Sequence, residues 1–403
     1  MPQNQPDGLI TLTSEELLNF AVETLLKHVR LHINGEKCTL ENVFELILKA
    51  SAGQTSINDV CDDTPGAASG TTVLNQLHQA LPQKLGQLWR LEAKLNDALV
   101  ANLTPRMRRV RCELAADLVL IPYHGQPAKD EKEIRRGQAR EGTTHFHCYA
   151  TLYMIYKDQR MTLCMTFVRK NDTMPDILRR LFRRLDVLNL NVKKLYLDKG
   201  FYSIAVIRLL KERGTPFILP AIARKNGGVS KLFVGRASYK TSYTLRNKKL
   251  GSEVVDLALT RKYSKGRYRR RKHSKRSKWF AYVTYRVRTH PLQIFQFYRR
   301  RFGIESSYRQ MNRVRVRTSS TNPALRLLYV GVAFLLINLW VCLKQQYACD
   351  LHRQGRRVNP RRLTLLRMMH LIIRAVEQRL KPLQNLRVPA SQVASVSLRG
   401  GAG

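Results

Sequence analysis

Acidic residues are scarce in this chain of 403 residues. Aspartate and glutamate together number 29, against 71 lysines and arginines, which leaves a formal net charge of +42. A compact fold with this excess repels itself unless a polyanion neutralises part of it. Nucleic acid is the partner that this charge favours, because phosphate contacts supply affinity whatever the base sequence. The apolar content of 44% excludes a disordered basic tail. A ribosomal-type binding protein and an unusually soluble basic protein are the alternatives that charge alone leaves open.

Closely spaced cysteine pairs are also lacking. The seven cysteines are an odd number, lie far apart and include no Cys-x-x-Cys pair. This spacing argues against a disulfide framework and against a zinc ribbon. The first residues, MPQNQPDG, lack the basic and then apolar pattern of a secretion signal. We therefore expect reduced, mostly buried cysteines in a cytoplasmic protein.

Only one long apolar run occurs, LRLLYVGVAFLLINLWVCL at residues 325–343. It has about the length of a membrane span. It contains Arg326 and Asn338, however, and a helix that is apolar on all sides is also found in the core of a large protein. We predict a buried core helix and no membrane partner, with a membrane span as the alternative.

Local patterns divide the chain into four predicted parts. These are a helical domain at 1–105, an α/β core formed by 106–224 and 289–345, a β-rich basic insertion at 225–288, and a C-terminal helical region with a flexible tail at 346–403.

The N-terminal part is predicted to be helical. Thr13 and Glu16 form a capping box ahead of an amphipathic run, and a second helix is predicted near residues 40–50. Residues 56–63 and 71–81, joined by a Gly/Ser-containing turn, resemble a helix-turn-helix pair with Thr72 near the second N-cap. Recognition of DNA by this pair is one interpretation, and a plain pair of bundle helices is the other.

The core part alternates short apolar runs with amphipathic segments. Strands are predicted at 111–123, 144–156, 160–168, 193–198 and 215–222, and helices at 174–189 and 203–214. Three antiparallel neighbours followed by strands that cross over through helices predict a mixed five-stranded sheet flanked by helices.

The insertion is predicted to contain three strands, at 231–245, 253–263 and 278–287. Between the last two, 11 of the 18 residues in RKYSKGRYRRRKHSKRSK are lysine or arginine, among them Arg269, Arg270 and Arg271. A solvated loop is one interpretation of this run. An arm that lies on a DNA backbone is the other, and both hold if the arm orders on binding.

Two aspartates stand at apolar strands. Asp117 lies within LAADLVLIP and Asp198 ends LYLD. Ionised carboxylates are rarely buried without a partner. If the first and fourth core strands are neighbours, the two side chains lie a few ångströms apart and repel each other unless a cation sits between them. Mg²⁺ suits such a site, because it binds through one or two carboxylates, waters and substrate phosphates.

A third acid is predicted on a helix that spans HPLQIFQFYRRRFGIESSYRQMNRVR. At about 100° per residue, one stripe of a regular helix would carry Glu305 in a row of DNA-binding residue types. The stripe comprises Tyr298, Arg301, Glu305, Arg309 and Asn312. A surface glutamate paired with Arg301 and Arg309 is the alternative. The two strand aspartates and the net charge make the catalytic hypothesis the preferred one.

Two further features resemble metal sites. His145 and His147 lie on one face of a strand, but the sequence offers no third ligand nearby, so we predict a structural or DNA-facing role. Asp130, Glu131 and Glu133 alternate with lysines in a polar loop, which favours a solvated charge run.

The segments DLVLIPYHG, LYLDKGFY and YRRRFGIESSYRQMN resemble the three catalytic blocks of insertion-sequence DDE transposases with an RNase H-like core. The last block is similar to the family's Tyr-x2-Arg-x3-Glu-x6-Lys signature. Tyr298, Arg301 and Glu305 match it, whereas Asn312, followed by Arg313, stands where the family has lysine. The resemblance covers roughly residues 110–345.

The resemblance implies an enzyme in which Asp117, Asp198 and Glu305 hold two Mg²⁺ or Mn²⁺ ions. Hydrolysis at the element end would free a 3′-OH, which would then attack target DNA in the same site. The predicted DNA contacts are Tyr298, Arg301, Arg309, Asn312, Arg313, Lys199, Arg269, Arg270 and Arg271.

The expected partner is double-stranded DNA, bound by a homodimer in the cytoplasm of a bacterium or archaeon. Two alternatives share part of this evidence. One is another RNase H-like nuclease, such as a junction resolvase, that has the same metal triad but no strand transfer. The other is a non-catalytic DNA-binding protein, which predicts that a triad acid is missing, although all three are present.

Overall fold

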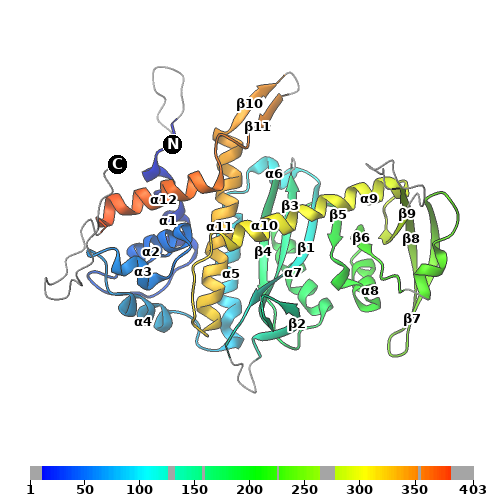
Figure 1. The fold of residues 1–403 in the computed structure, drawn as a ribbon, viewed down its shortest axis with the longest axis horizontal. Coiled ribbons are helices and arrows are strands. Elements are labelled where there is room, and N and C mark those ends of the chain that lie inside the picture. The colour runs from blue at the N-terminus through cyan, green and yellow to red at the C-terminus, as the bar shows by residue number, and fades with distance from the viewer. Residues whose placement is uncertain are drawn as a thin grey trace, which may run out of the picture.

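The chain is built on one large mixed sheet, with helices on both of its faces and a helical layer at one end (Figure 1). The computed structural model describes residues 11–125, 132–156, 159–224, 227–263, 277–352 and 355–382. Within these residues the sheet has nine strands, in the order β2-β3-β1-β5-β6-β9-β8-β7, and β4 also pairs with β3.

The centre of the sheet is the predicted five-stranded core. Its strands are β1 (Cys112–Pro122), β3 (Thr143–Tyr156), β4 (Gln159–Phe167), β5 (Val192–Leu197) and β6 (Phe217–Pro220). β3 pairs antiparallel with both β1 and β4, whereas β1–β5 and β5–β6 are parallel pairs. Their nearly unbroken apolar runs are typical of strands covered on both faces. The predicted mixed sheet is therefore confirmed.

Four further strands lengthen this sheet. β2 (Ile134–Arg140) pairs with β3, and its polar sequence gave no strand signal. At the other end β9 (Ser277–Tyr285) pairs antiparallel with β6, and β8 (Gly251–Tyr263) and β7 (Tyr239–Asn247) follow it. The insertion therefore continues the core sheet and covers the open edge of β6, which would otherwise present unpaired backbone groups.

Side chains on alternate positions of β1 belong to two different cores. Leu114 and Ala116 pack with α7 (Met174–Leu188) and α8 (Ile204–Glu212) on one face. Ala115 and Val119 pack on the opposite face, in the core that also contains residues of the C-terminal helices. Asp117 shares the second face, because side chains two apart on a strand point the same way.

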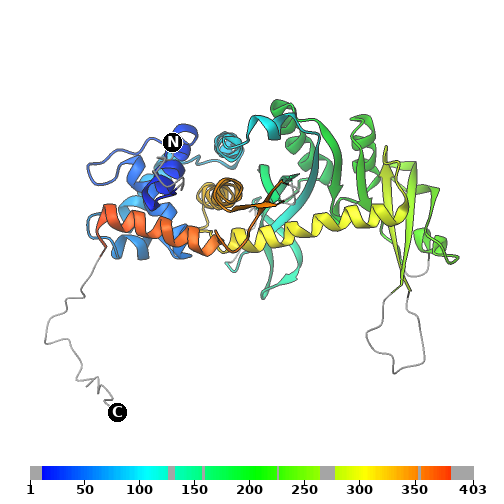
Figure 2. The ribbon, with the colours of Figure 1, turned by 90° about the horizontal axis from the view of Figure 1, so that it is seen from above.

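That second face is crossed by a long helical rod and covered by two more helices. The rod consists of α9 (Pro291–Arg299), the 3-10 turn η4 (Arg300–Phe302) and α10 (Gly303–Asn312), shown in yellow in Figure 2. α5 (Leu88–Val100) and α11 (Pro323–Tyr347) pack against each other and against β4.

The apolar run at 325–343 forms most of α11. This helix is long and apolar enough to cross a membrane, but 89% of its most apolar window is buried inside the structure. The Asn338 amide pairs with both the N–H and the carbonyl of Thr162 on β4, each at 2.8 Å. Asn96 of α5 does the same for Met165, at 2.9 Å. The prediction of a buried core helix is confirmed, and its asparagine completes the hydrogen bonding of an edge strand.

The helical layer at the end of the sheet joins the two ends of the chain. It contains α1 (Ser14–His28), α2 (Leu40–Gly53), α3 (Ile57–Asp62), α4 (Gly70–Ala80) and α12 (Leu365–Leu380). The predicted capping box of Thr13 and Glu16 is present. α12 packs on α1 and α2, where Arg379 Nη1 lies 2.5 Å from Glu45 Oε1. The N-terminal and C-terminal regions are thus one layer in space (Figure 1).

The remaining elements are short. They are η1 (Leu85–Gln87), α6 (Pro105–Arg109), η2 (Lys199–Phe201), η3 (Gly228–Leu232) and the hairpin of β10 (Cys349–His352) and β11 (Gly355–Val358).

Candidate active site

Asp117, in the middle of β1, and Asp198, directly after the end of β5, are brought together by the parallel pairing of these two strands. Ala116 of β1 is in register with Leu197 of β5, and each aspartate is the next residue along its strand. The expectation that the first and fourth core strands are neighbours is therefore confirmed. Asp198 also begins η2, because its Oδ2 accepts a hydrogen bond from the Gly200 N–H at 3.2 Å.

A single guanidinium lies between the two acids. Arg301 Nη1 is 2.8 Å from Asp117 Oδ2, and Nη2 is 2.9 Å from Asp198 Oδ1. The arginine side chain is 6% exposed, against 14% for Asp117 and 37% for Asp198. Burial disfavours the charged arginine, but its neighbour Tyr298 and the two carboxylates outweigh this effect and raise the pKa of Arg301. The aspartates therefore keep a positive charge between them.

The turn that carries Arg301 interrupts the predicted helix. A regular helix was expected through residues 290–312, but η4 separates α9 from α10. A 3-10 turn has about 3.0 residues per turn instead of about 3.6, so the predicted single stripe does not continue across it. Arg160 crosses the turn close to Gly303, where any added Cβ would lie 1.7 Å from its Cζ. It donates to the Arg300 carbonyl at 3.1 Å and so helps to hold the turn.

Tyr298 was expected to contact DNA, but its side chain is buried in the structure. Its hydroxyl donates to the Leu197 carbonyl at 3.2 Å, and its ring centroid lies 5.1 Å from that of Tyr282. Because Tyr298 and Arg301 are both only 5% exposed, neither presents a surface to a partner in this arrangement. Their packing fastens α9 and η4 to the sheet, and their contact with DNA stays a prediction.

Glu305 lies in α10, four residues after Arg301, and its side chain is outside the part of the chain that the structure describes. α10 itself is fixed over the first two core strands. The Tyr308 hydroxyl is 2.6 Å from Thr151 Oγ1, and Thr151 is the β3 residue in register with Asp117. Among the described side chains, no three metal-binding groups lie together.

The other predicted DNA contacts fall into two sets. Four are exposed: Lys199, Arg309, Asn312 and Arg313. Lys199 directly follows Asp198, and the other three lie at or just beyond the C-terminal end of α10. The remaining three, Arg269, Arg270 and Arg271, lie outside the described residues.

Glu113 is a buried acid that the sequence reasoning missed. It lies four residues before Asp117 on the same face of β1. The Tyr196 hydroxyl donates to it at 2.8 Å, and Lys194 Nζ and Arg300 Nη1 lie 3.5 and 3.3 Å away. Burial opposes its ionisation, but this hydrogen bond and these cations lower the pKa of Glu113 overall. Like Asp117, Glu113 is an acid within an apolar strand, and this pattern in the sequence identifies it.

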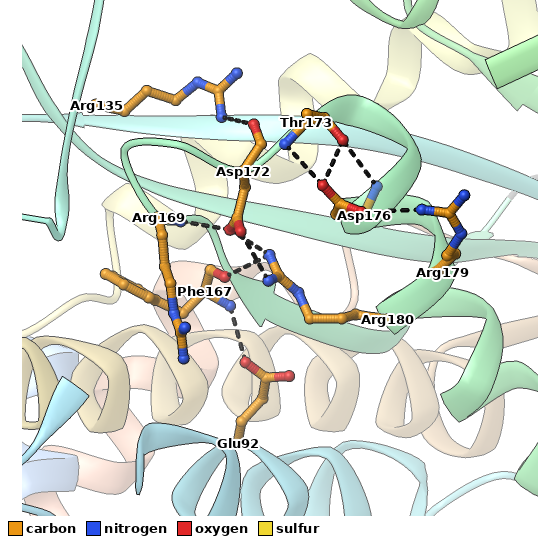
Figure 3. Close-up of polar contacts among 9 residues, drawn as sticks. All are labelled: Glu92, Arg135, Phe167, Arg169, Asp172, Thr173, Asp176, Arg179 and Arg180. Atoms are coloured by element: carbon orange, nitrogen blue, oxygen red, sulfur yellow. Dashed lines mark hydrogen bonds and ion pairs between the residues drawn. The ribbon is translucent and has the colours of Figure 1, made fainter. Parts of the chain in front are cut away.

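A second group of acids lies at the start of α7 and is engaged by local partners (Figure 3). Asp172 accepts from Arg180 Nη2 at 2.5 Å and from the Arg169 N–H at 2.6 Å. Asp176 closes a capping box with Thr173 and is 2.9 Å from Arg179. These contacts fix the turn between β4 and α7, so this group is structural.

The features that resembled metal sites gather no ligand set among the described residues. His147 is buried, and neither ring nitrogen has a hydrogen-bond partner in the described part of the chain. Burial first, and then the nearby arginines 326 and 315, lower the pKa of His147 to about 3, so the ring is neutral. Asp130 and Glu131 lie outside the described residues.

A comparison with models of protein families identifies the family of this chain. The model described as "Transposase DDE domain" matches residues 108–339, which is more than half of the chain. The chain therefore belongs to the DDE transposase family.

A solved structure extends this result to the fold. The chain is similar to the piggyBac transposase in a cryo-EM synaptic complex with hairpin DNA. The two are 12% identical, the match covers 93% of this chain and 79% of that one, and the TM-score is 0.54. This likeness supports the RNase H-like fold. No curated protein matches the chain.

Proposed function

We propose that this transposase cleaves DNA at the ends of an insertion sequence and joins the freed 3′-OH to target DNA by two-metal phosphoryl transfer. One observation carries the proposal. Asp117 lies within β1 and Asp198 directly after the adjacent parallel strand β5, with one oxygen of each directed at the same cation. Acids that share a cation in this way are suited to bind a divalent metal ion.

The residues present fit such a metal site. Carboxylate oxygens are the ligands that Mg²⁺ and Mn²⁺ prefer, and Asp117 and Asp198 supply them from rigid strands. Glu305 would be the third ligand, from a helix that Tyr308 fastens over β3. Two ions held there would activate the attacking water or hydroxyl and stabilise the leaving oxygen.

The chain's own residues would bind and orient the DNA. Lys199 and Arg309 are exposed at the ends of the elements that carry Asp198 and Glu305. Contacts from such residues to phosphates set the register of a strand in the site. Asn312 and Arg313, on the exposed surface beyond Arg309, would extend this contact. The similar structure is a synaptic complex with hairpin DNA, which supports DNA as the partner. We propose that this DNA is double-stranded and that the active form is a homodimer.

Cleavage and joining of the element's own end DNA test the proposal. We expect the protein to cut and join this DNA with Mg²⁺ or Mn²⁺, and Asp198→Asn and Glu305→Gln to abolish both steps. Asp256→Asn is the matched control, because it removes an exposed carboxylate on β8 and should leave both steps unchanged. Undiminished activity in the two site variants would overturn the proposal.

The same assay separates the alternatives. Cleavage without joining, lost in both site variants, would favour an RNase H-like nuclease. Binding of end DNA without any cleavage would favour a non-catalytic DNA-binding relative.

A further inference from the structure

Arg301 spans the Asp117–Asp198 pair with the two ends of one guanidinium. Each terminal nitrogen holds a different acid, at 2.8 and 2.9 Å. The planar fork of arginine suits paired carboxylates, and such charge-assisted bonds are stronger than neutral ones. The guanidinium therefore supplies the positive charge that two neighbouring acids require.

The other oxygen of each acid already has a hydrogen-bond donor. Asp117 Oδ1 accepts from the Leu118 N–H at 2.8 Å, and Asp198 Oδ2 accepts from the Gly200 N–H at 3.2 Å. The two remaining oxygens, Asp117 Oδ2 and Asp198 Oδ1, are the ones that Arg301 bridges. A metal ion bound by both acids must therefore compete with the guanidinium for them.

The turn has contacts to the sheet besides those of the Arg301 side chain. The Tyr298 hydroxyl, just before the turn, donates to the Leu197 carbonyl at 3.2 Å, and Arg160 donates to the Arg300 carbonyl at 3.1 Å. Neither contact involves the Arg301 guanidinium. The long arginine side chain can therefore leave the acids without unfolding the turn.

We propose that Arg301 is an internal counterion that closes the metal site and is displaced when divalent metal binds. The inference rests on the proposed function, because it takes Asp117 and Asp198 as metal ligands. The displaced guanidinium becomes available to a phosphate oxygen, which its fork suits as well as a carboxylate. Binding of the metal would therefore free Arg301 for the contact with a DNA strand that the sequence predicts.

The test is a Mn²⁺ titration of the protein in the absence of DNA, with free Mn²⁺ measured by electron paramagnetic resonance. The variants are Arg301→Gln, Arg301→Lys and the adjacent Arg300→Gln. Removing the competing charge should tighten Mn²⁺ binding about tenfold in Arg301→Gln, as expected for the loss of one competing ion pair. Arg301→Lys should show a smaller gain, because one ammonium cannot bridge both acids as a fork does.

Arg300→Gln is the matched control, since it removes the same charge from the same turn but faces Glu113. It should bind Mn²⁺ as the unmodified protein does. If Arg301→Gln unfolds without metal, thermal unfolding of Arg301→Lys decides the matter. Added Mn²⁺ should then raise the Tm of Arg301→Lys more than that of the unmodified protein.

Two results would overturn the inference, and they differ in what else they remove. Equal Mn²⁺ affinity and equal Tm gains in the Arg301 variants and the unmodified protein would refute the counterion role alone, provided that Asp198→Asn still weakens binding. No Mn²⁺ binding by any of these proteins would refute the proposed metal site as well.

Discussion

Two consecutive arginines of η4 contact two acids of β1: Arg300 contacts Glu113, and Arg301 contacts Asp117. The two acids differ in how many of their partners lie within the protein and in how close the solvent is. Glu113 is bonded by Tyr196 and surrounded by Arg300 and two lysines, and its side chain is 10% exposed. Asp117 and Asp198 share the guanidinium of Arg301, and their side chains are 14% and 37% exposed. An acid surrounded by several cations is part of the scaffold. Acids that share an exchangeable guanidinium, one of them open to solvent, form a site that can accept a ligand.

The comparison explains why burial alone does not locate an active site. Glu113 is the more buried acid, and its ion pairs are satisfied within the protein. Removing one partner of such a cluster leaves buried charges uncompensated, which is strongly destabilising. At the Asp117–Asp198 pair the solvent limits this cost, so the position tolerates exchange of its cation.

The largest expected effect is therefore a loss of stability when Glu113 is substituted. Glu113→Gln should lower the free energy of unfolding by about 3 kcal/mol, because Lys194 and Arg300 lose their counterion. Asp198→Asn should change it by no more than about 1 kcal/mol, as usual for a partly exposed ion pair. Urea-induced unfolding, followed by circular dichroism, measures both values.

The matched control for these two variants is Asp186→Asn. Asp186 pairs with Arg213 on the surface and is 56% exposed, so its loss should cost less than about 0.5 kcal/mol. If Glu113→Gln and Asp198→Asn lowered the free energy of unfolding by the same amount, the distinction between the buried Glu113 cluster and the partly exposed Asp117–Asp198 pair would be refuted.

Glu92 is an acid whose hydrogen bond and nearby charges do not outweigh the effect of burial on its pKa. Burial is the main influence on this side chain of α5 and raises the pKa of Glu92 to about 7, although the Phe167 N–H donates to it at 2.9 Å. The folded state therefore binds the proton more tightly than the unfolded state. Stability should fall as the pH rises from about 4.5 to 7.

Glu92→Gln should remove this pH dependence. At pH 8 the variant should be more stable than the unmodified protein by roughly 1–3 kcal/mol, and at pH 4 the two should be alike. Thermal unfolding at the two pH values measures the difference. An equal Tm change at both values would show that Glu92 is not protonated on folding below pH 7.

The central sheet could be predicted because its strands are continuous apolar runs, and the buried helix because it is apolar on every side. The edge pairing of β9 with β6 could not, since the local pattern of residues 277–285 specifies a strand but not its neighbour. β2 was missed because its sequence, IRRGQAR, is polar and its outer residues are exposed. The N-terminal helices have local signals, but the packing of α12 against α1 and α2 has none.

At the candidate site, the two aspartates could be predicted because strand-borne acids are conspicuous in an apolar run. The position of Arg301 could not. Its placement depends on the 3-10 turn at Arg300–Phe302. That turn is contacted beside Gly303 by Arg160, which is more than 140 residues away in sequence. A helical wheel assumes a constant rotation per residue, so a break of this kind changes the face of every later residue.

A change at Tyr308 should have a small effect on stability and a larger one on DNA cleavage. Tyr308→Phe removes the hydrogen bond to Thr151 Oγ1 and should cost about 1 kcal/mol of unfolding free energy. Because that bond fastens α10, which carries Glu305, end cleavage should fall roughly tenfold to a hundredfold through misplacement of the helix. Tyr239→Phe, which removes a hydroxyl bond to the Leu232 carbonyl on the insertion, should leave cleavage unchanged. A cleavage rate in Tyr308→Phe equal to that of Tyr239→Phe would mean that α10 keeps its place without Tyr308, and that the helix is held by its apolar packing alone.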